Sequence, residues 1–180
     1  MTHINIRTVF GRFILILLFG GLLIAPISSC RVVKYSFTGA SISPDVKTVS
    51  VDYFQNLSAL VNPALSNIFT EALKDRFITQ TSLNNVKDYG DLQFSGQITG
   101  YSISPIAIQG NEIAAKNRLT INIRVKFENT KDNKFNFDKT FSQFEDYSSD
   151  RDFPSVESEL VKTIVGKLID EIFNSSVANW

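Results

Sequence analysis

The stretch RLTINIRVKF at residues 118–127 decides the fold of this chain. Apolar residues occupy every second position of it: Leu119, Ile121, Ile123, Val125 and Phe127. Because successive side chains of a strand point to opposite faces, this period of two predicts a strand with one buried and one solvated face. The strand extends over residues 117–129 and belongs to a sheet that is apolar on one side.

Three further segments carry strand patterns, at residues 48–54, 91–104 and 135–143. In the first of them, Val49, Val51 and Tyr53 alternate with polar residues and should share one face. Gly96 and Gly100 suggest a bend or a bulge in the second. A hairpin turn at residues 131–134 joins the strand at 117–129 to the last one.

Two segments follow helical spacing. The first begins at Asn62-Pro63, with Asn62 as N-cap and Pro63 at the first helical position, and ends near Thr81. The second covers residues 154–175 and is strongly amphipathic. The order is β-α-β-β-β-α. We expect an α+β fold, a two-layer sandwich in which two helices cover one face of a four-stranded mixed sheet.

The beginning of the chain is typical of a bacterial lipoprotein precursor. Arg7 and Arg12 precede the uncharged apolar stretch of 13 residues at 13–25, which is shorter than the roughly 20 residues of a membrane span. Pro26 ends it, and Ile-Ser-Ser-Cys follows at residues 27–30. We predict a signal peptide at 1–29, a lipid-modified Cys30 that begins a tether at 30–47, and one domain at 48–180.

Composition excludes several classes of function. Without residues 1–29 the chain has 151 residues with 16 basic and 18 acidic side chains, which argues against a nucleic-acid binder. His3 and Cys30 are the chain's only histidine and cysteine. The domain therefore lacks the residues of Ser–His or Cys–His catalysis and of the usual zinc sites. We expect no enzyme, no metal and no cofactor.

Five basic residues are candidates for contact with a glycolipid head group, whose phosphates and carboxylates suit Arg and Lys. Three lie at polar positions of the strand at 117–129, and two follow across the turn; an ordinary solvated face of mixed charge is the alternative. The five are Arg118, Arg124, Lys126, Lys134 and Lys139.

The phenylalanines of the last strand allow two interpretations. Phe137 and Phe141 share one strand face with Phe135, which favours packing in the core. A surface that contacts lipid or a partner, with Phe144 included, is the other interpretation.

Seven stretches together resemble the Bacteroidetes branch of the LptE family, the lipopolysaccharide-assembly lipoproteins of the outer membrane. They are YSFTG (35–39), TVSVDYF (48–54), FTEALKDRF (69–77), GDLQFSG (90–96), SPIAIQGNE (104–112), RLTINIRVKF (118–127) and FEDY (144–147). The resemblance implies a sandwich of four strands and two helices. It also implies a partner, the outer-membrane β-barrel LptD, which the lipoprotein plugs and helps to assemble, and contact with lipopolysaccharide.

The expected location is the outer membrane, with the domain facing the periplasm or the barrel lumen. Arg31, not Asp, follows the lipidated cysteine, and by the usual sorting logic this permits release to the outer membrane. The competing hypothesis is a free-standing, periplasm-facing lipoprotein that binds a soluble ligand or peptidoglycan.

Overall fold

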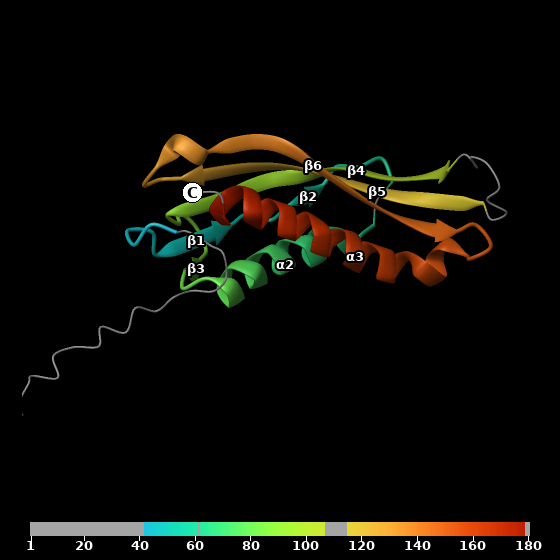
Figure 1. The fold of residues 1–180 in the computed structure, drawn as a ribbon, viewed down its shortest axis with the longest axis horizontal. Helices are drawn as coiled ribbons and strands as arrows, with labels where there is room; N and C mark the ends of the chain where they lie inside the picture. Colours follow the sequence, from blue (N-terminus) through green and yellow to red (C-terminus); the bar gives the residue numbers. More distant parts are fainter. Residues whose placement is uncertain (1–41, 61, 107–114, 179–180) are drawn as a thin grey trace, which may run out of the picture. The chain divides into compact units, whose positions relative to one another are not determined.

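The computed structural model describes residues 42–60, 62–106 and 115–178 of the chain, which form a sheet and two long helices (Figure 1). The predicted signal peptide, the lipid-modified Cys30 and most of the tether lie outside the described residues. In chain order the elements are β1 (Thr48–Val51), β2 (Gln55–Asn56), α2 (Leu65–Gln80), β3 (Asn84–Val86), β4 (Leu92–Ile106), β5 (Lys116–Asn129), the 3-10 helix η1 (Asn133–Phe135), β6 (Phe137–Ser148), α3 (Phe153–Phe173) and the π-helical turn η2 (Asn174–Ala178).

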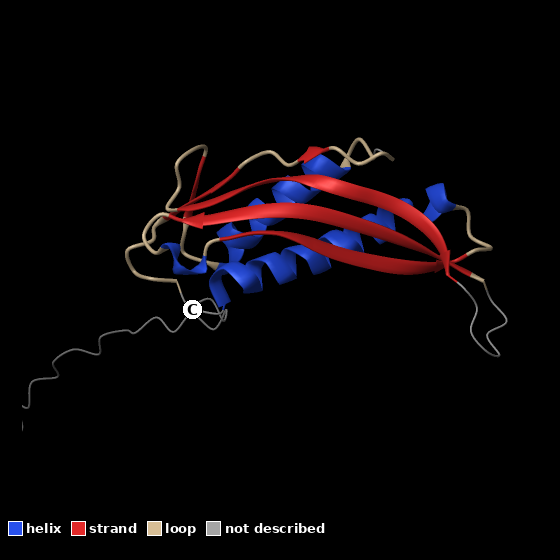
Figure 2. Ribbon diagram, turned by 90° about the horizontal axis from the view of Figure 1, so that it is seen from above, coloured by secondary structure: helices blue, strands red, loops and turns tan. Residues whose placement is uncertain are grey.

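The strands form one mixed sheet. Their order is β3-β1-β4-β5-β6, and β2 pairs with β4 further along that strand. β1 runs parallel to β3 and β4, whereas β4, β5 and β6 are antiparallel neighbours. Both helices cover the same face of the sheet and pack against each other (Figures 1 and 2). The predicted two-layer sandwich is confirmed, with a 6-stranded sheet in place of four strands.

The two strands that the sequence did not predict are very short. β3 has 3 residues and β2 has 2. β3 pairs with β1, where Asn84 lies opposite Thr48 and Asn85 opposite Val49. Backbone pairing of this kind needs no alternation of apolar side chains, so hydrophobic periodicity does not reveal it.

The strand predicted at residues 48–54 ends early, at Val51. The backbone N–H of Phe54 donates to Thr70 Oγ1 of α2 at 3.1 Å, and the Phe54 ring lies 4.9 Å from Phe69 at an edge-to-face angle. Phe54 is fully buried, while Tyr53 is 61% exposed. The expectation that Tyr53 shares the buried face was wrong, because the chain turns here to insert Phe54 against α2.

The packed part of the chain begins before residue 48. Val46 is buried, and Ile42 packs against the hydrophobic core. Ile42 and Val46, which we expected to be part of the tether, therefore pack against the core of the domain.

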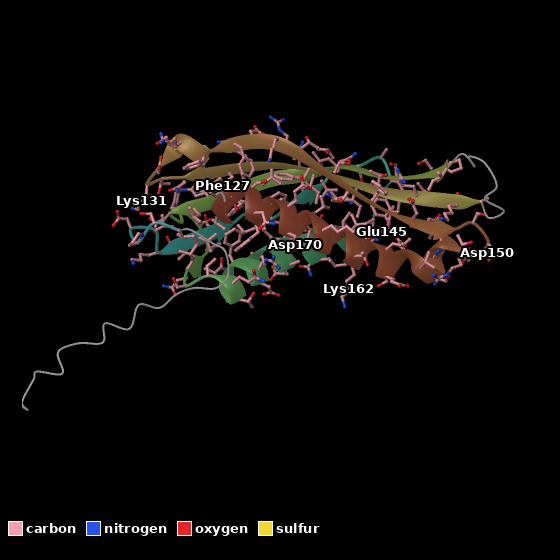
Figure 3. All side chains as sticks on the ribbon, viewed as in Figure 1. Phe127, Lys131, Glu145, Asp150, Lys162 and Asp170 are labelled. Carbon is pink, nitrogen blue, oxygen red and sulfur yellow. The ribbon has the colours of Figure 1, made fainter. Side chains whose placement is uncertain are left out.

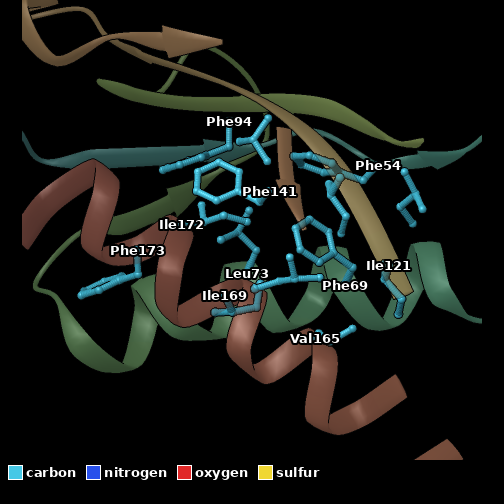
Figure 4. Close-up of a cluster of buried hydrophobic side chains, with 14 of the residues drawn as sticks. Phe54, Phe69, Leu73, Phe94, Ile121, Phe141, Val165, Ile169, Ile172 and Phe173 are labelled. Carbon is cyan, nitrogen blue, oxygen red and sulfur yellow. The ribbon is translucent and has the colours of Figure 1, made fainter. Parts of the chain in front are cut away.

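The core lies between the sheet and the helices. The five alternate residues of β5 that predicted the fold are all 0% exposed. Phe94 of β4 lies between Phe77 of α2, at 4.8 Å, and Phe127 of β5, at 4.9 Å, and Phe77 lies 5.1 Å from Phe173 of α3. Figure 4 shows Phe94 among side chains of both helices. Each fully buried Phe contributes roughly 1.5–3 kcal/mol, so this row of rings holds both layers together.

The phenylalanines of β6 divide between the two interpretations. Phe141 is buried, and Phe137 packs partly buried against the core, with their rings 5.8 Å apart. Phe144 is 43% exposed and points to the other face. Core packing is therefore confirmed for Phe137 and Phe141 but not for Phe144.

Asn62 and Glu157 tie both helices to the sheet. Asn62 Oδ1 accepts hydrogen bonds from the backbone of Ala64 at 2.9 Å and Leu65 at 3.1 Å, in the turn that precedes α2. The predicted helix start was wrong by two residues, because α2 begins at Leu65 with Ala64 as its N-cap. Asn62 Nδ2 donates to Glu157 Oε1 of α3 at 2.7 Å. The Tyr101 hydroxyl of β4 donates to the same oxygen at 2.6 Å. Burial and this bond raise the pKa of Tyr101.

Gly96 marks the closest approach in the sheet. It has a φ of 155°, and a Cβ there would collide with the Arg124 carbonyl of β5 and lie 2.8 Å from the Phe54 ring. The predicted irregularity is confirmed, and the register of β4 on β5 shifts just beyond, between Ile98 and Gly100.

Gly96→Ala should lower the free energy of unfolding by about 3 kcal/mol, because backbone atoms cannot move aside cheaply. Gly166 is the matched control, since a Cβ there meets nothing within 4 Å on α3. Gly166→Ala should stabilise by about 1 kcal/mol through helix propensity. Urea unfolding measures both; equal effects of the two substitutions would contradict the close approach at Gly96.

Candidate functional site

Three of the five basic candidates share the face of the sheet that the helices leave open. Arg118, Arg124 and Lys126 alternate along β5 with its buried residues and therefore point away from α2 and α3. Lys134 lies apart from them, in η1 beyond the end of β5.

Lys139 lies on the helix-covered side, which corrects the grouping expected from the sequence. Its register partner on β5 is the buried Val125. The Lys139 Nζ lies 4.6 Å from the centre of the Phe141 ring and donates to Ser175 Oγ at 3.2 Å. Its side chain therefore packs along the edge of the core toward η2.

Arg118 is held on the open face by two neighbours from β6. Its Nε and Nη2 donate to the two carboxylate oxygens of Asp146 at 2.7 Å and 3.0 Å. Its guanidinium lies 3.6 Å from the centre of the Phe144 ring. The bidentate pair raises the pKa of Arg118 and lowers that of Asp146. Phe144 thus serves as a stacking surface for Arg118.

Arg124 and Lys126 also have carboxylate partners. Arg124 donates to both oxygens of Asp138 at 2.8 Å, and Lys126 Nζ lies 3.0 Å from Glu128 Oε2. The bond from Arg124 lowers the pKa of Asp138. Three basic side chains on this face are therefore each paired with a carboxylate. Exposed pairs of this kind contribute at most about 1 kcal/mol each to stability.

Two adjoining hollows lie at one end of the open face, and the sequence did not predict them. Gln93 of β4 and Glu128 of β5 lie opposite each other and line both hollows. One hollow, of about 290 Å³, is also lined by Ser50, Asp52, Asp88, Tyr89 and Ser95. The other, of about 320 Å³, is also lined by Asn129, Thr130, Asn133 and Asn136. The hydrophobic periodicity of a single segment cannot indicate these hollows, because residues from separate connections between strands line them.

Asp91 joins the two connections that border these hollows. Its carboxylate accepts hydrogen bonds from the backbone N–H groups of Lys47 at 2.8 Å and Thr48 at 3.1 Å, and from the Thr48 hydroxyl at 3.0 Å. Lys131, at the turn after β5 (Figure 3), pairs with it at 3.0 Å. The bond from the Lys47 backbone, followed by the Lys131 pair, holds the pKa of Asp91 well below its usual range.

Within residues 42–60, 62–106 and 115–178, no three His, Cys, Asp or Glu side chains are grouped so as to hold a metal ion. None of the helices that the structure describes is long and apolar enough to cross a membrane.

Comparison with known sequences identifies the family. The LptE family, described as lipopolysaccharide-assembly, matches residues 46–176. This match covers almost all of the described domain, and the chain belongs to the LptE family. No protein with a curated description matches the sequence.

Solved structures share the architecture at low sequence identity. The protein CT253 from Chlamydia trachomatis is 10% identical with a TM-score of 0.50, over 74% of this chain and 99% of that one. A minor lipoprotein from Acinetobacter baumannii is 15% identical with a TM-score of 0.49, over 72% of this chain and 91% of that one. The likeness to CT253 supports the fold alone.

Asp91→Asn should lower the free energy of unfolding at pH 7 by about 1–3 kcal/mol, because charge-assisted hydrogen bonds are lost. Since folding lowers the pKa of Asp91, its contribution is present above about pH 4 and fades as the pH falls. The gap between variant and parent should therefore narrow by about pH 2.

Urea titrations at both pH values test this. Asp88→Asn is the control, because the exposed Asp88 makes no hydrogen bond or ion pair with the described residues. A gap for Asp91→Asn that is the same at both pH values would contradict the proposed role of its charge.

Proposed function

We propose that this protein is an outer-membrane lipoprotein, held by acyl chains on Cys30, that plugs and helps to assemble an LptD-type β-barrel and takes part in lipopolysaccharide transport to the outer leaflet. The observation that carries the proposal is the family match over residues 46–176. Its domain then faces the periplasm or the barrel lumen, and its work is non-enzymatic.

The surface of the domain is compatible with a place inside a barrel. The interior of a large outer-membrane barrel is polar, so a plug must present polar groups to it. The open face of the sheet does so, with two Arg–carboxylate pairs, one Lys–Glu pair and hydroxyl or amide side chains between them.

Contact with lipopolysaccharide is proposed for Arg118, Arg124 and Lys126, which share the open face. A guanidinium that now binds a carboxylate through two hydrogen bonds offers the same two donors to a phosphate. Arg124 is best placed for such an exchange, because 57% of its side chain is exposed against 36% for Arg118. The phosphate must compete with Asp138 for it.

The double variant Arg124→Gln with Lys126→Gln should weaken lipopolysaccharide binding about tenfold, the effect of roughly 1.4 kcal/mol. Asp138→Asn should instead strengthen it, because the competing carboxylate is removed. Lys139→Gln is the control, since it removes one positive charge from the helix-covered side and leaves the open face unchanged. Binding of fluorescent lipopolysaccharide to the detergent-solubilised chain measures all three.

If affinity is the same in the double variant and in Lys139→Gln, the open face is not the contact surface. If Asp138→Asn binds more weakly than the unaltered chain, the exchange of carboxylate for phosphate is contradicted.

Anchoring depends on one sulfur atom. Cys30→Ala should leave an unprocessed or soluble protein, because the thiol that accepts the diacylglycerol is missing, and two or more acyl chains are needed for stable attachment. Membrane fractionation and labelling with an alkyne fatty acid check this. Acyl labelling and normal membrane association of the variant would show that the lipid is elsewhere.

A further inference from the structure

β6 is the last strand in the order of the sheet. One of its two sides therefore has no neighbouring strand in the part of the chain that the structure describes. With 12 residues it is also a long edge strand. Such an edge presents a row of backbone N–H and C=O groups, with which a strand of another chain can pair.

The hydrogen bonds to β5 determine which residues of β6 turn these groups outward. The Ser149 N–H donates to the carbonyl of Ala115, which lies directly opposite it when the register is continued by one residue. Because bonded and non-bonded pairs alternate along an antiparallel ladder, the odd-numbered residues of β6 bond to β5. The even-numbered residues within 138–146 therefore direct their N–H and C=O groups away from the sheet. Lys167 Nζ of α3, which donates to the Phe144 carbonyl at 3.5 Å, agrees with this direction.

Two opposite charges lie at equal distances from the middle of this edge. Lys139 is three residues before Ser142, and Glu145 is three residues after it. Both point to the helix-covered side, because their register partners on β5 are the buried Val125 and Leu119. In an antiparallel pair of β6 strands centred on Ser142, Lys139 of each copy lies opposite Glu145 of the other.

We infer that the free edge of β6 pairs in this way with the same edge of a second copy of this chain. The interface is isologous, with its two-fold axis at Ser142, and it joins the two sheets into one with all four helices on the same side. Because Ser142 turns its backbone groups outward, the two copies of it form a hydrogen-bonded pair. Moving the axis by one residue would place Lys139 opposite Gln143 or Tyr147, so only the register centred on Ser142 matches the charges.

The side chains on the open face also fit this register. Phe144, whose side chain is 43% exposed, lies opposite Thr140 of the second copy. Pairs of an aromatic and a β-branched residue are favourable across antiparallel strands. Asp138 lies opposite Asp146, but each already accepts two hydrogen bonds from an arginine of its own chain. Two neutral pairs therefore meet at each end of the interface.

Lys167 makes this pairing reversible. Its Nζ contacts the Phe144 carbonyl and forms an ion pair with Glu145, and both groups are needed by the second copy. Its side chain is 47% exposed, so the ion pair contributes little and the side chain can turn into solvent. A lysine at a sheet edge is a usual protection against uncontrolled pairing. Lys167→Gln should therefore strengthen the dimer.

A disulfide tests the register in the full chain within its own membrane. Ser142→Cys should give a disulfide-linked dimer after mild oxidation, because the two Cα atoms would lie about 5.5 Å apart. Thr140→Cys is the matched control on the same strand and face. Its two copies would be four residues apart along the strand, about 13 Å, which is too far for a disulfide. The unaltered chain should give no such dimer, since the sulfur of Cys30 is proposed to carry lipid.

Charge reversal tests the contact between the copies. Lys139→Glu should weaken the dimer about tenfold, because two cross-strand attractions become repulsions. Adding Glu145→Lys to that variant should restore the affinity. Lys134→Glu is the control, since it makes the same change of charge in η1, outside β6. Sedimentation equilibrium of the detergent-solubilised full chain measures all of them.

Absence of the dimer with Ser142→Cys would overturn the inference, and so would equal yields from Ser142→Cys and Thr140→Cys. Equal effects of Lys139→Glu and Lys134→Glu, or no recovery in the double variant, would overturn it as well. The inference goes beyond the proposed function and does not rest on it, because it concerns copies of the chain outside a barrel. A chain that copurifies with a barrel but forms no dimer contradicts this inference alone.

Discussion

One-sided burial of the sheet is the constraint on which the rest of the structure depends. Five alternate residues of β5, Leu119 to Phe127, are inaccessible to solvent, and Phe94 and Ile98 of β4 and Phe141 of β6 are buried on the same face. An apolar face of this size must be covered, and α2 and α3 cover it. Phe77 of α2 contacts both Phe173 of α3 and Phe94 of β4, and Phe94 in turn contacts Phe127 of β5. The helices leave the opposite face of the sheet uncovered.

The sequence predicted those features that depend on residues close to one another in the chain. The alternation of residues 117–129 and the irregularity near Gly96 both appear in the structure, whereas α2 begins two residues later than the predicted cap at Asn62 implied. The short strands β2 and β3 did not follow from it, because they pair through the backbone with strands far away in the chain. The exposure of Tyr53 was also missed, since it results from the burial of Phe54 against a helix.

The candidate site was predicted less well for a related reason. Alternation tells on which face Arg124 lies, but its partner Asp138 depends on the register between β5 and β6. Lys139 was grouped with it because turn length alone does not determine that register. The two hollows bring together residues of β1, β4, β5 and two connections, and no single segment carries a signal for them.

The chain belongs to the LptE family, and the open face of its sheet is polar. On that face Arg118, Arg124 and Lys126 are each paired with a carboxylate. Binding of a phosphate there requires an exchange of partners, as proposed for Arg124, and salt should weaken it because both charges are exposed.

The most direct test of the central claim is the isolation of the protein from its own membrane in mild detergent, through a tag at its carboxyl end. The account predicts that one large, heat-modifiable β-barrel protein copurifies with it, and that depletion of the lipoprotein impairs the assembly of that barrel. Recovery of the lipoprotein alone, with barrel assembly unaffected by its depletion, would contradict the account and favour a free-standing lipoprotein that binds a soluble ligand or peptidoglycan.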